Sequence, residues 1–397
     1  MTFTTRFIQV TSAVLILGLM AGLCGCDQLA SILSTETAEH IIDTSIEFDV
    51  GLALPLTGTT TASTGLSMQR GFNLARDEIN ELDSPVRINF ILEDDGGTAE
   101  GAVAAVERLI DAGVTAILGI AYSNQARQVF PITESNGVIA ISPLSAAAGL
   151  SGIGEYTFRT ALAVNIKNTA GIKATHAQLG YERAAVIYND AEFYSISSRE
   201  YMTAPLADLG VDVLTVQTFQ TGDTDLTAQL TEITRLNPDV LFIPTLASEA
   251  VGIMVQARQL GITSQFILSA LGIEEIEMAG DAAEGAITFG SWSSESDNPL
   301  SRAFVENYRS TYGVEPDPWA AQSYATLFIL FRAIVDTVLI DPAATDAASI
   351  RDTLAMTKDF DTNLGRFSFD PNGEAVYDPV VLVVKHSNLE VFGSDAM

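Results

Sequence analysis

Short apolar runs alternate with helix-like patterns through most of this 397-residue chain, and this alternation constrains the fold more than any other feature. A first block has strand-like runs at residues 48–56, 87–92, 115–121 and 138–141. A second block has strand-like runs at residues 183–188, 211–219, 240–243 and 266–268. Strands that alternate with helices at this spacing favour parallel sheets covered by helices on both faces. The sequence therefore predicts an α/β protein with two lobes.

Two segments in the C-terminal third need separate interpretations. The stretch from Ala325 to Ile340 is as apolar as a membrane span, but Arg332 and Asp336 interrupt it. We therefore expect a buried helix there. Further on, two strand-like runs flank a turn sequence at residues 370–373. Residues 366–369 and 380–384 are accordingly expected to pair as a β-hairpin.

The N-terminus has the pattern of a secretory signal. Arg6 precedes an apolar run from Phe7 to Leu23, and small residues follow. The end of this run resembles a bacterial lipobox, with Leu23 three residues before Cys26. The resemblance implies that the thiol of Cys26 is acylated, which anchors the chain to a membrane on its extracytoplasmic face. Residues 27–46 are polar and are expected to be a tether. The alternatives are a plain secreted protein or an uncleaved anchor helix.

The composition argues against several classes of function. Both cysteines, Cys24 and Cys26, lie in the signal region, so the mature chain has none for a disulfide or a metal site. The three histidines are scattered along the chain, and we expect neither a metal nor a cofactor. A formal net charge of -30 would repel phosphate backbones and argues against nucleic acid as a partner. Common hydrolase and phosphate-loop motifs are missing, so no enzyme activity is expected.

Several segments together resemble the type I periplasmic binding proteins of the leucine/isoleucine/valine-binding family. The matching segments are residues 51–58, 71–75, 93–95, 141–143 and 365–370. The resemblance implies two doubly wound α/β lobes that are joined by three crossover strands and close on a ligand in the cleft between them. The first lobe is expected to comprise residues 47–163 plus 288–362, and the second residues 164–287 plus 363–397.

The same resemblance implies a set of ligand-binding positions. Ser123 takes the place of a residue that receives a ligand carboxylate, although an ordinary helix N-cap is the alternative. Tyr194 corresponds to an aromatic residue that covers the ligand. In the loop after the fourth strand, Ala146 stands where the family often has a hydroxyl. Either the loop shifts by one residue and Ser145 bonds the ligand, or this contact uses only the backbone. The remaining candidate positions are Thr64, Tyr122, Ser142, Leu144, Leu246 and Trp319.

Leu271 departs from the family pattern. Amino-acid binders usually have an acidic residue at this position to pair with the ligand ammonium, and leucine cannot do this. One possibility is that Glu274, Glu275 or Asp190 supplies the carboxylate instead. The other is that the ligand has no ammonium group, which would fit a carboxylate or an amide.

The predicted function is that of a lipid-anchored, monomeric solute-binding protein. It would capture a small polar metabolite, such as an amino acid or a related carboxylate or amide, and present it to the permease of an ABC importer. Two alternatives use the same fold. One is a lipoprotein that regulates cell-wall synthases through protein contacts, and the other is the ligand-sensing subunit of a membrane receptor.

Overall fold

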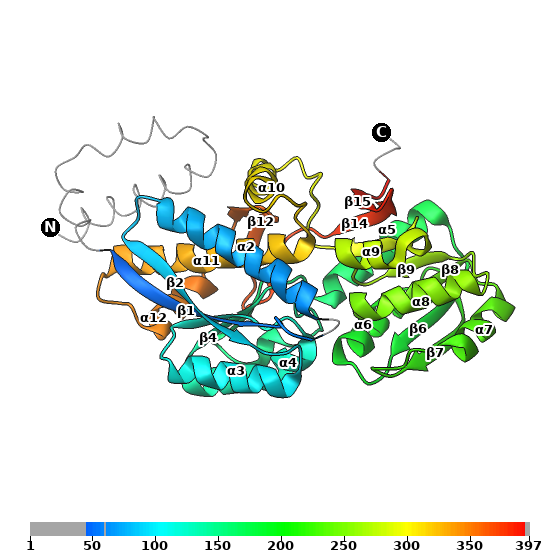
Figure 1. Cartoon of the computed structure of the whole chain (residues 1–397), viewed down its shortest axis with the longest axis horizontal. Coiled ribbons are helices and arrows are strands. Elements are labelled where there is room, and N and C mark those ends of the chain that lie inside the picture. Colours follow the sequence, from blue (N-terminus) through cyan, green and yellow to red (C-terminus); the bar gives the residue numbers. More distant parts are fainter. Residues whose placement is uncertain (1–44, 59–60, 394–397) are drawn as a thin grey trace.

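The computed structural model describes residues 45–58 and 61–393. The expected signal segment with Cys26 lies outside these residues, as does all but the end of the expected tether. The described chain forms two α/β lobes that lie side by side (Figure 1). The expected fold class is therefore confirmed.

The first lobe is built on a five-stranded, wholly parallel sheet in the order β2-β1-β3-β4-β5. Its strands are β1 (Ile46–Leu54), β2 (Val86–Asp94), β3 (Ala116–Gly119), β4 (Ile139–Ser142) and β5 (Thr157–Arg159). Its helices are α2 (Ala62–Glu81), α3 (Ala99–Asp111), α4 (Ser123–Asn136), α10 (Pro299–Tyr312), α11 (Pro318–Ile340) and α12 (Ala347–Ala355). Helices α2 and α11 lie on one face of the sheet, and α3 and α4 lie on the other (Figure 1).

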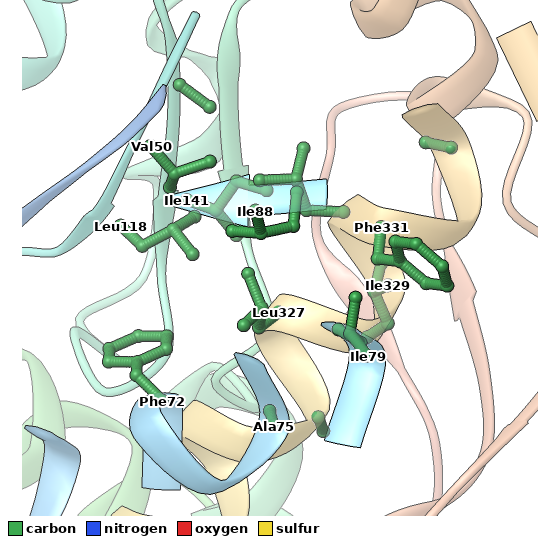
Figure 2. Close-up of a cluster of buried hydrophobic side chains, with 14 of the residues drawn as sticks. Val50, Phe72, Ala75, Ile79, Ile88, Leu118, Ile141, Leu327, Ile329 and Phe331 are labelled. Atoms are coloured by element: carbon green, nitrogen blue, oxygen red, sulfur yellow. The ribbon is translucent and has the colours of Figure 1, made fainter. Parts of the chain in front are cut away.

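The main core of the first lobe lies between the sheet and the α2–α11 pair. Figure 2 shows sheet residues Val50, Ile88, Leu118 and Ile141 beside Phe72, Ala75 and Ile79 of α2 and Leu327, Ile329 and Phe331 of α11. Gly71 permits the close approach of the two helices, because a Cβ there would lie only 2.9 Å from the Ala320 carbonyl carbon. Helix α11 is long and apolar enough to cross a membrane, but most of it is buried in this core. Arg332 and Asp336 form an ion pair at 2.7 Å on its less buried side.

The second lobe has a seven-stranded sheet in the order β15-β14-β10-β9-β8-β6-β7. Its strands are β6 (Arg183–Asn189), β7 (Asp212–Phe219), β8 (Val240–Ile243), β9 (Gln265–Leu268), β10 (Ile287–Gly290), β14 (Val380–Lys385) and β15 (Asn388–Val391). Helices α5 (Val164–Leu179) and α6 (Phe193–Thr203) pack on one face. Helices α7 (Thr227–Leu236), α8 (Ala247–Gln259) and α9 (Ile273–Ala279) pack on the other. Within this sheet β14 pairs antiparallel with β10 and with β15, and the pairs formed by β6 to β10 are parallel.

The chain passes between the lobes three times, after β5, after β10 and before β14. Two expected boundaries differ from the observed ones. Strand β10 belongs to the second sheet, so the first lobe resumes after residue 290 and not at residue 288. Residues 364–377 pack in the core of the first lobe, although 363–397 was expected in the second.

The second difference has a local cause in the tail. Strand β12 (Gly365–Phe369) pairs with β11 (Phe360–Thr362) and with β13 (Ala375–Val376). The expected hairpin between residues 366–369 and 380–384 is therefore wrong. The turn at 370–373 does reverse the chain, but β14 pairs with β10 and β15 in the other lobe.

Candidate functional site

A cavity of about 570 Å³, partly open to solvent, lies between the two lobes. The first lobe lines it with Thr64, Ala121, Tyr122, Ser123, Leu144 and Trp319. The second lobe lines it with Lys167, Tyr194, Leu246, Ala247, Ser248, Ala270 and Glu275. Several of these residues follow the carboxyl ends of parallel strands, where open α/β sheets bind ligands.

A second cavity of about 400 Å³ shares four lining residues with the first. The shared residues are Leu144, Lys167, Ala270 and Trp319. Ala146 and Leu271 line only the second cavity. Nine of the eleven ligand-binding positions expected from the sequence thus line one cavity or the other. The two exceptions are Ser142 and Ser145.

Ser123 is the first residue of α4, and Tyr122 occupies the N-cap position before it. The Tyr122 amide donates to the side-chain oxygen of Gln125 at 3.1 Å. The Ser123 hydroxyl is buried and accepts a hydrogen bond from the Ala147 amide at 3.1 Å. Ser123 is therefore not an N-cap; it joins α4 to the loop after β4. Because Tyr122 and Ser123 line this cavity, α4 begins at its wall. The first N–H groups of a helix have no partner within the helix, and a helix N-terminus favours an anion.

Ser142 and Ser145 are buried and use their hydroxyls within the loop. The Ser142 Oγ donates to the Ile120 carbonyl at 2.8 Å and accepts from the Ser145 amide at 3.0 Å. The two hydroxyl oxygens lie 2.6 Å apart. These contacts fix the shape of the loop and turn both side chains away from the cavities.

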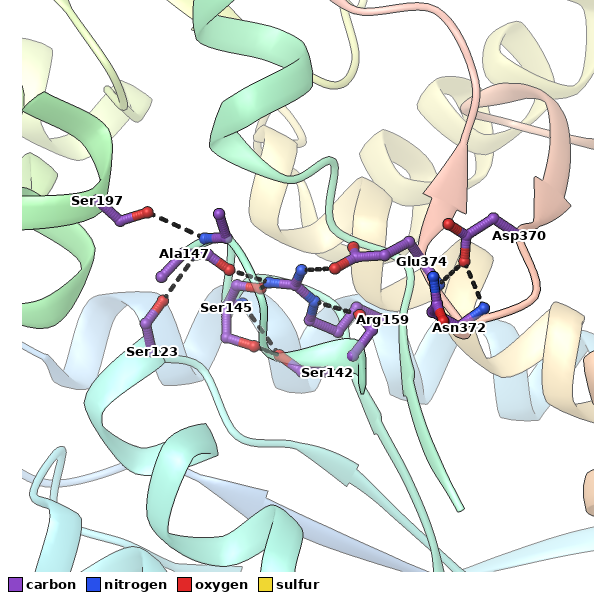
Figure 3. Close-up of polar contacts among 11 residues, drawn as sticks. Ser123, Ser142, Ser145, Ala147, Arg159, Ser197, Asp370, Asn372 and Glu374 are labelled. Atoms are coloured by element: carbon purple, nitrogen blue, oxygen red, sulfur yellow. Dashed lines mark hydrogen bonds and ion pairs between the residues drawn. The ribbon is translucent and has the colours of Figure 1, made fainter. Parts of the chain in front are cut away.

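Arg159 stabilises the same loop through hydrogen bonds to its backbone. Sequence reasoning missed this residue. Its side chain is fully buried at the end of β5. It donates to the carbonyl oxygens of Ser145 and Ala147 at 2.9 and 2.6 Å. It also donates to the Ser151 hydroxyl at 2.8 Å and forms an ion pair with Glu374 (Figure 3). Arg159 thereby connects the loop that lines the cleft with the small sheet that contains β12 and β13.

A lysine and a glutamate of the second lobe line the large cavity. Lys167 lies in the first turn of α5, and burial lowers its pKa to about 8. Glu275 lies in the first turn of α9, and burial raises its pKa to about 7. Glu274 and Asp190, the other two carboxylates considered for an ammonium, are exposed and line neither cavity. Lys167 was missed because a single lysine in a helix pattern is normally a surface residue.

The lobes also contact each other beside the cavity. The Ala148 amide donates to the hydroxyl of Ser197 on α6 at 3.0 Å (Figure 3). The Phe193 amide donates to the Asn124 side chain at 3.3 Å, and the Arg127 guanidinium lies 5.0 Å from the centre of the Phe193 ring. The structure thus joins the lobes directly along the side where α4 faces α6.

Comparison with known proteins agrees with this architecture. A family model described as periplasmic binding protein matches residues 47–388. The chain belongs to this family. As a periplasmic binding protein it is a solute-binding protein, not an enzyme, and its folded part lies outside the cytoplasm.

Individual relatives are distant but match along nearly their full length. The leucine-, isoleucine-, valine-, threonine- and alanine-binding protein of Pseudomonas aeruginosa is 23% identical, with 82% of this chain and 86% of that protein covered. A leucine-binding protein from Thermotoga maritima is 27% identical, with a TM-score of 0.80 over 88% of this chain and 100% of that one. A solute-binding protein from R. palustris in complex with benzoate is 21% identical, with a TM-score of 0.79, 88% of this chain and 96% of that one being covered.

Proposed function

We propose that this protein is a lipid-anchored carrier that captures a small polar metabolite, an amino acid or a related carboxylate or amide, and delivers it to an ABC importer. The observation that carries this proposal is the cavity between the lobes. Residues of both lobes line it, and α4 begins at its wall. A ligand there contacts both lobes only when they are together, so its binding favours the closed form. The capture of the solute by this protein requires no covalent bond to be broken.

The comparisons support this range of ligands without narrowing it. Relatives carry names that refer to amino acids, whereas one solved neighbour holds benzoate, which has a carboxylate and no ammonium. In this chain Leu271 and Leu246 give the second lobe an apolar wall, which suits a solute with an apolar body. Glu275 is the carboxylate that an ammonium would meet in the same cavity.

The direct test is a thermal-shift screen of the purified protein against amino acids, carboxylates and amides. A ligand at concentrations well above its dissociation constant should stabilise the protein by ~2–4 kcal/mol, which is measurable as a rise in melting temperature. The regulator alternative needs no such ligand. A screen in which no small solute raises the melting temperature would argue for that alternative.

Ser123→Ala is expected to weaken binding of a carboxylate solute by roughly 1–3 kcal/mol, because the hydroxyl that shapes the α4 end of the cavity is lost. Titration calorimetry with a solute found in the screen measures this change. Ser135→Ala, near the other end of α4 and exposed, is the matched control and should bind normally. If Ser123→Ala binds the solute with unchanged affinity, Ser123 is not part of the binding site.

Cys26→Ala is expected to release the protein from membranes, because acylation requires the thiol. The measurement is the distribution of the protein between the membrane and soluble fractions of cells that express it. Cys24→Ala is the matched control, since its neighbour Leu23 makes it the poorer acceptor. A Cys26→Ala protein that remains in the membrane fraction would contradict the proposed anchor.

A further inference from the structure

Lys167 is a buried cation in the centre of the cleft. It lies at the start of α5, directly after the first crossing between the lobes, and only 7% of the residue is exposed. It is one of the four residues that line both cavities. A lysine this buried is normally paired with a carboxylate.

The described residues supply fewer hydrogen-bond acceptors than the Lys167 ammonium can use. The Lys167 Nζ donates to the Ser269 carbonyl at 2.9 Å and lies at the 3.5 Å limit from the Phe289 carbonyl. The Tyr194 hydroxyl shares the same Ser269 carbonyl at 3.1 Å, and the Tyr194 ring centre lies 5.8 Å from Nζ. An ammonium has three donors, so at least one is free for another acceptor.

No charge balances Lys167 within the described part of the chain. None of the ion pairs among residues 45–58 and 61–393 involves it, and burial is the cause that lowers its pKa. Glu275 lines the same large cavity but forms no ion pair with it. Apart from Lys167, the second cavity is lined by uncharged residues, both apolar ones such as Leu271 and polar ones such as Gln322. A cation in such surroundings is unfavourable unless an anion joins it.

We propose that the Lys167 ammonium is the anion-binding group of the second lobe and that it receives a carboxylate of the transported solute. This inference rests on the proposed solute-binding function and narrows it to acids. The solute completes the charge balance of the cleft when it binds. Lys167 belongs to the second lobe and the N-terminus of α4 to the first. A carboxylate bound between them interacts favourably with both lobes and therefore favours the closed form.

Matched probes can separate acids from neutral and cationic analogues. L-leucine, isocaproate and benzoate each carry a carboxylate, whereas leucinamide and benzamide carry an amide in its place. Binding of each to the whole protein is measured by calorimetry and thermal shift. We expect at least one acid to bind, and its amide to bind much more weakly.

Three substitutions at Lys167 test the role of the charge. Lys167→Met and Lys167→Gln should weaken binding of that acid by roughly ten- to a hundredfold and remove the preference for the acid over its amide. Lys167→Arg keeps the charge and should keep the preference. Lys173→Met is the matched control, because Lys173 lies exposed on the same helix. Circular dichroism and the melting temperature of the free variants establish that each is folded.

The outcomes distinguish the two levels of the proposal. If the acid binds Lys167→Met and the original protein equally well, or if amides bind as tightly as acids, the role of Lys167 is wrong while the carrier function stands. If none of the probes and no solute in the wider screen binds the original protein, the carrier function fails and the role of Lys167 fails with it.

Discussion

Replacing Arg159 with methionine is expected to lower the free energy of unfolding by about 3–5 kcal/mol, the usual cost of removing one partner of a buried ion pair. The substitution leaves Glu374 without its cation and leaves the buried carbonyl oxygens of Ser145 and Ala147 without a donor. The side chain of Glu374 is only 17% exposed, so water replaces the lost partner poorly. Equilibrium urea unfolding, followed by circular dichroism, measures the change.

An exposed arginine provides the control for Arg159. Arg302 pairs with Asp297 on the surface, where the two side chains are 65% and 97% exposed. Arg302→Met should therefore change stability by less than about 1 kcal/mol. A similarly small effect of Arg159→Met would mean that the loop after β4 does not depend on this network. Ligand affinity should fall in the folded fraction of Arg159→Met, since the loop that carries Leu144 and Ala146 loses its support.

Gly71→Ala is expected to lower stability by roughly 1–3 kcal/mol, because the new methyl group overlaps the backbone of Ala320. A backbone carbonyl cannot rotate away as a flexible side chain can, so α11 must shift relative to α2. The intrinsic helix preference of alanine returns at most ~1 kcal/mol of this loss. The shift also moves Trp319, which lines both cavities and immediately precedes Ala320. Urea unfolding and ligand titration should therefore both respond.

The control for Gly71 is another helical glycine. A Cβ at Gly252, on α8, would have nothing closer than the Gln256 amide nitrogen at 3.9 Å. Gly252→Ala should be neutral or stabilising by up to ~1 kcal/mol. If the two substitutions behave alike, the close contact between α2 and α11 does not restrain the fold.

The alternation of strands and helices predicted the framework because each run has a local cause. Strands such as β8 and β9 are short apolar segments, and their boundaries coincide closely with the sequence pattern. The tail was harder to predict. Strand β13 has only two residues, too few to form a visible pattern, so the sequence pattern favours the longer run at β14 as the hairpin partner.

The candidate site positions were predicted from resemblance to the family and not from local sequence patterns. Positions such as Ser123 and Leu271 came from resemblance to a family. Such a resemblance indicates which positions bind ligand in related proteins. Lys167 and Arg159 are properties of this chain's packing. Arg159 meets Glu374 across 215 residues of sequence, and no local pattern indicates a partner at that distance. Both cations matter because they are buried, and burial depends on tertiary packing that local sequence patterns do not indicate.

Because the chain passes between the lobes three times, neither lobe can fold completely early in synthesis. The core of the first lobe combines β1 to β5 with residues that follow β10, up to Tyr377. The second sheet needs β14, which begins only at Val380. Neither lobe can bury its full core until almost the whole chain has emerged from the ribosome. A nascent chain of this protein therefore stays incompletely folded until late in synthesis, the condition in which it can be threaded through a narrow export channel.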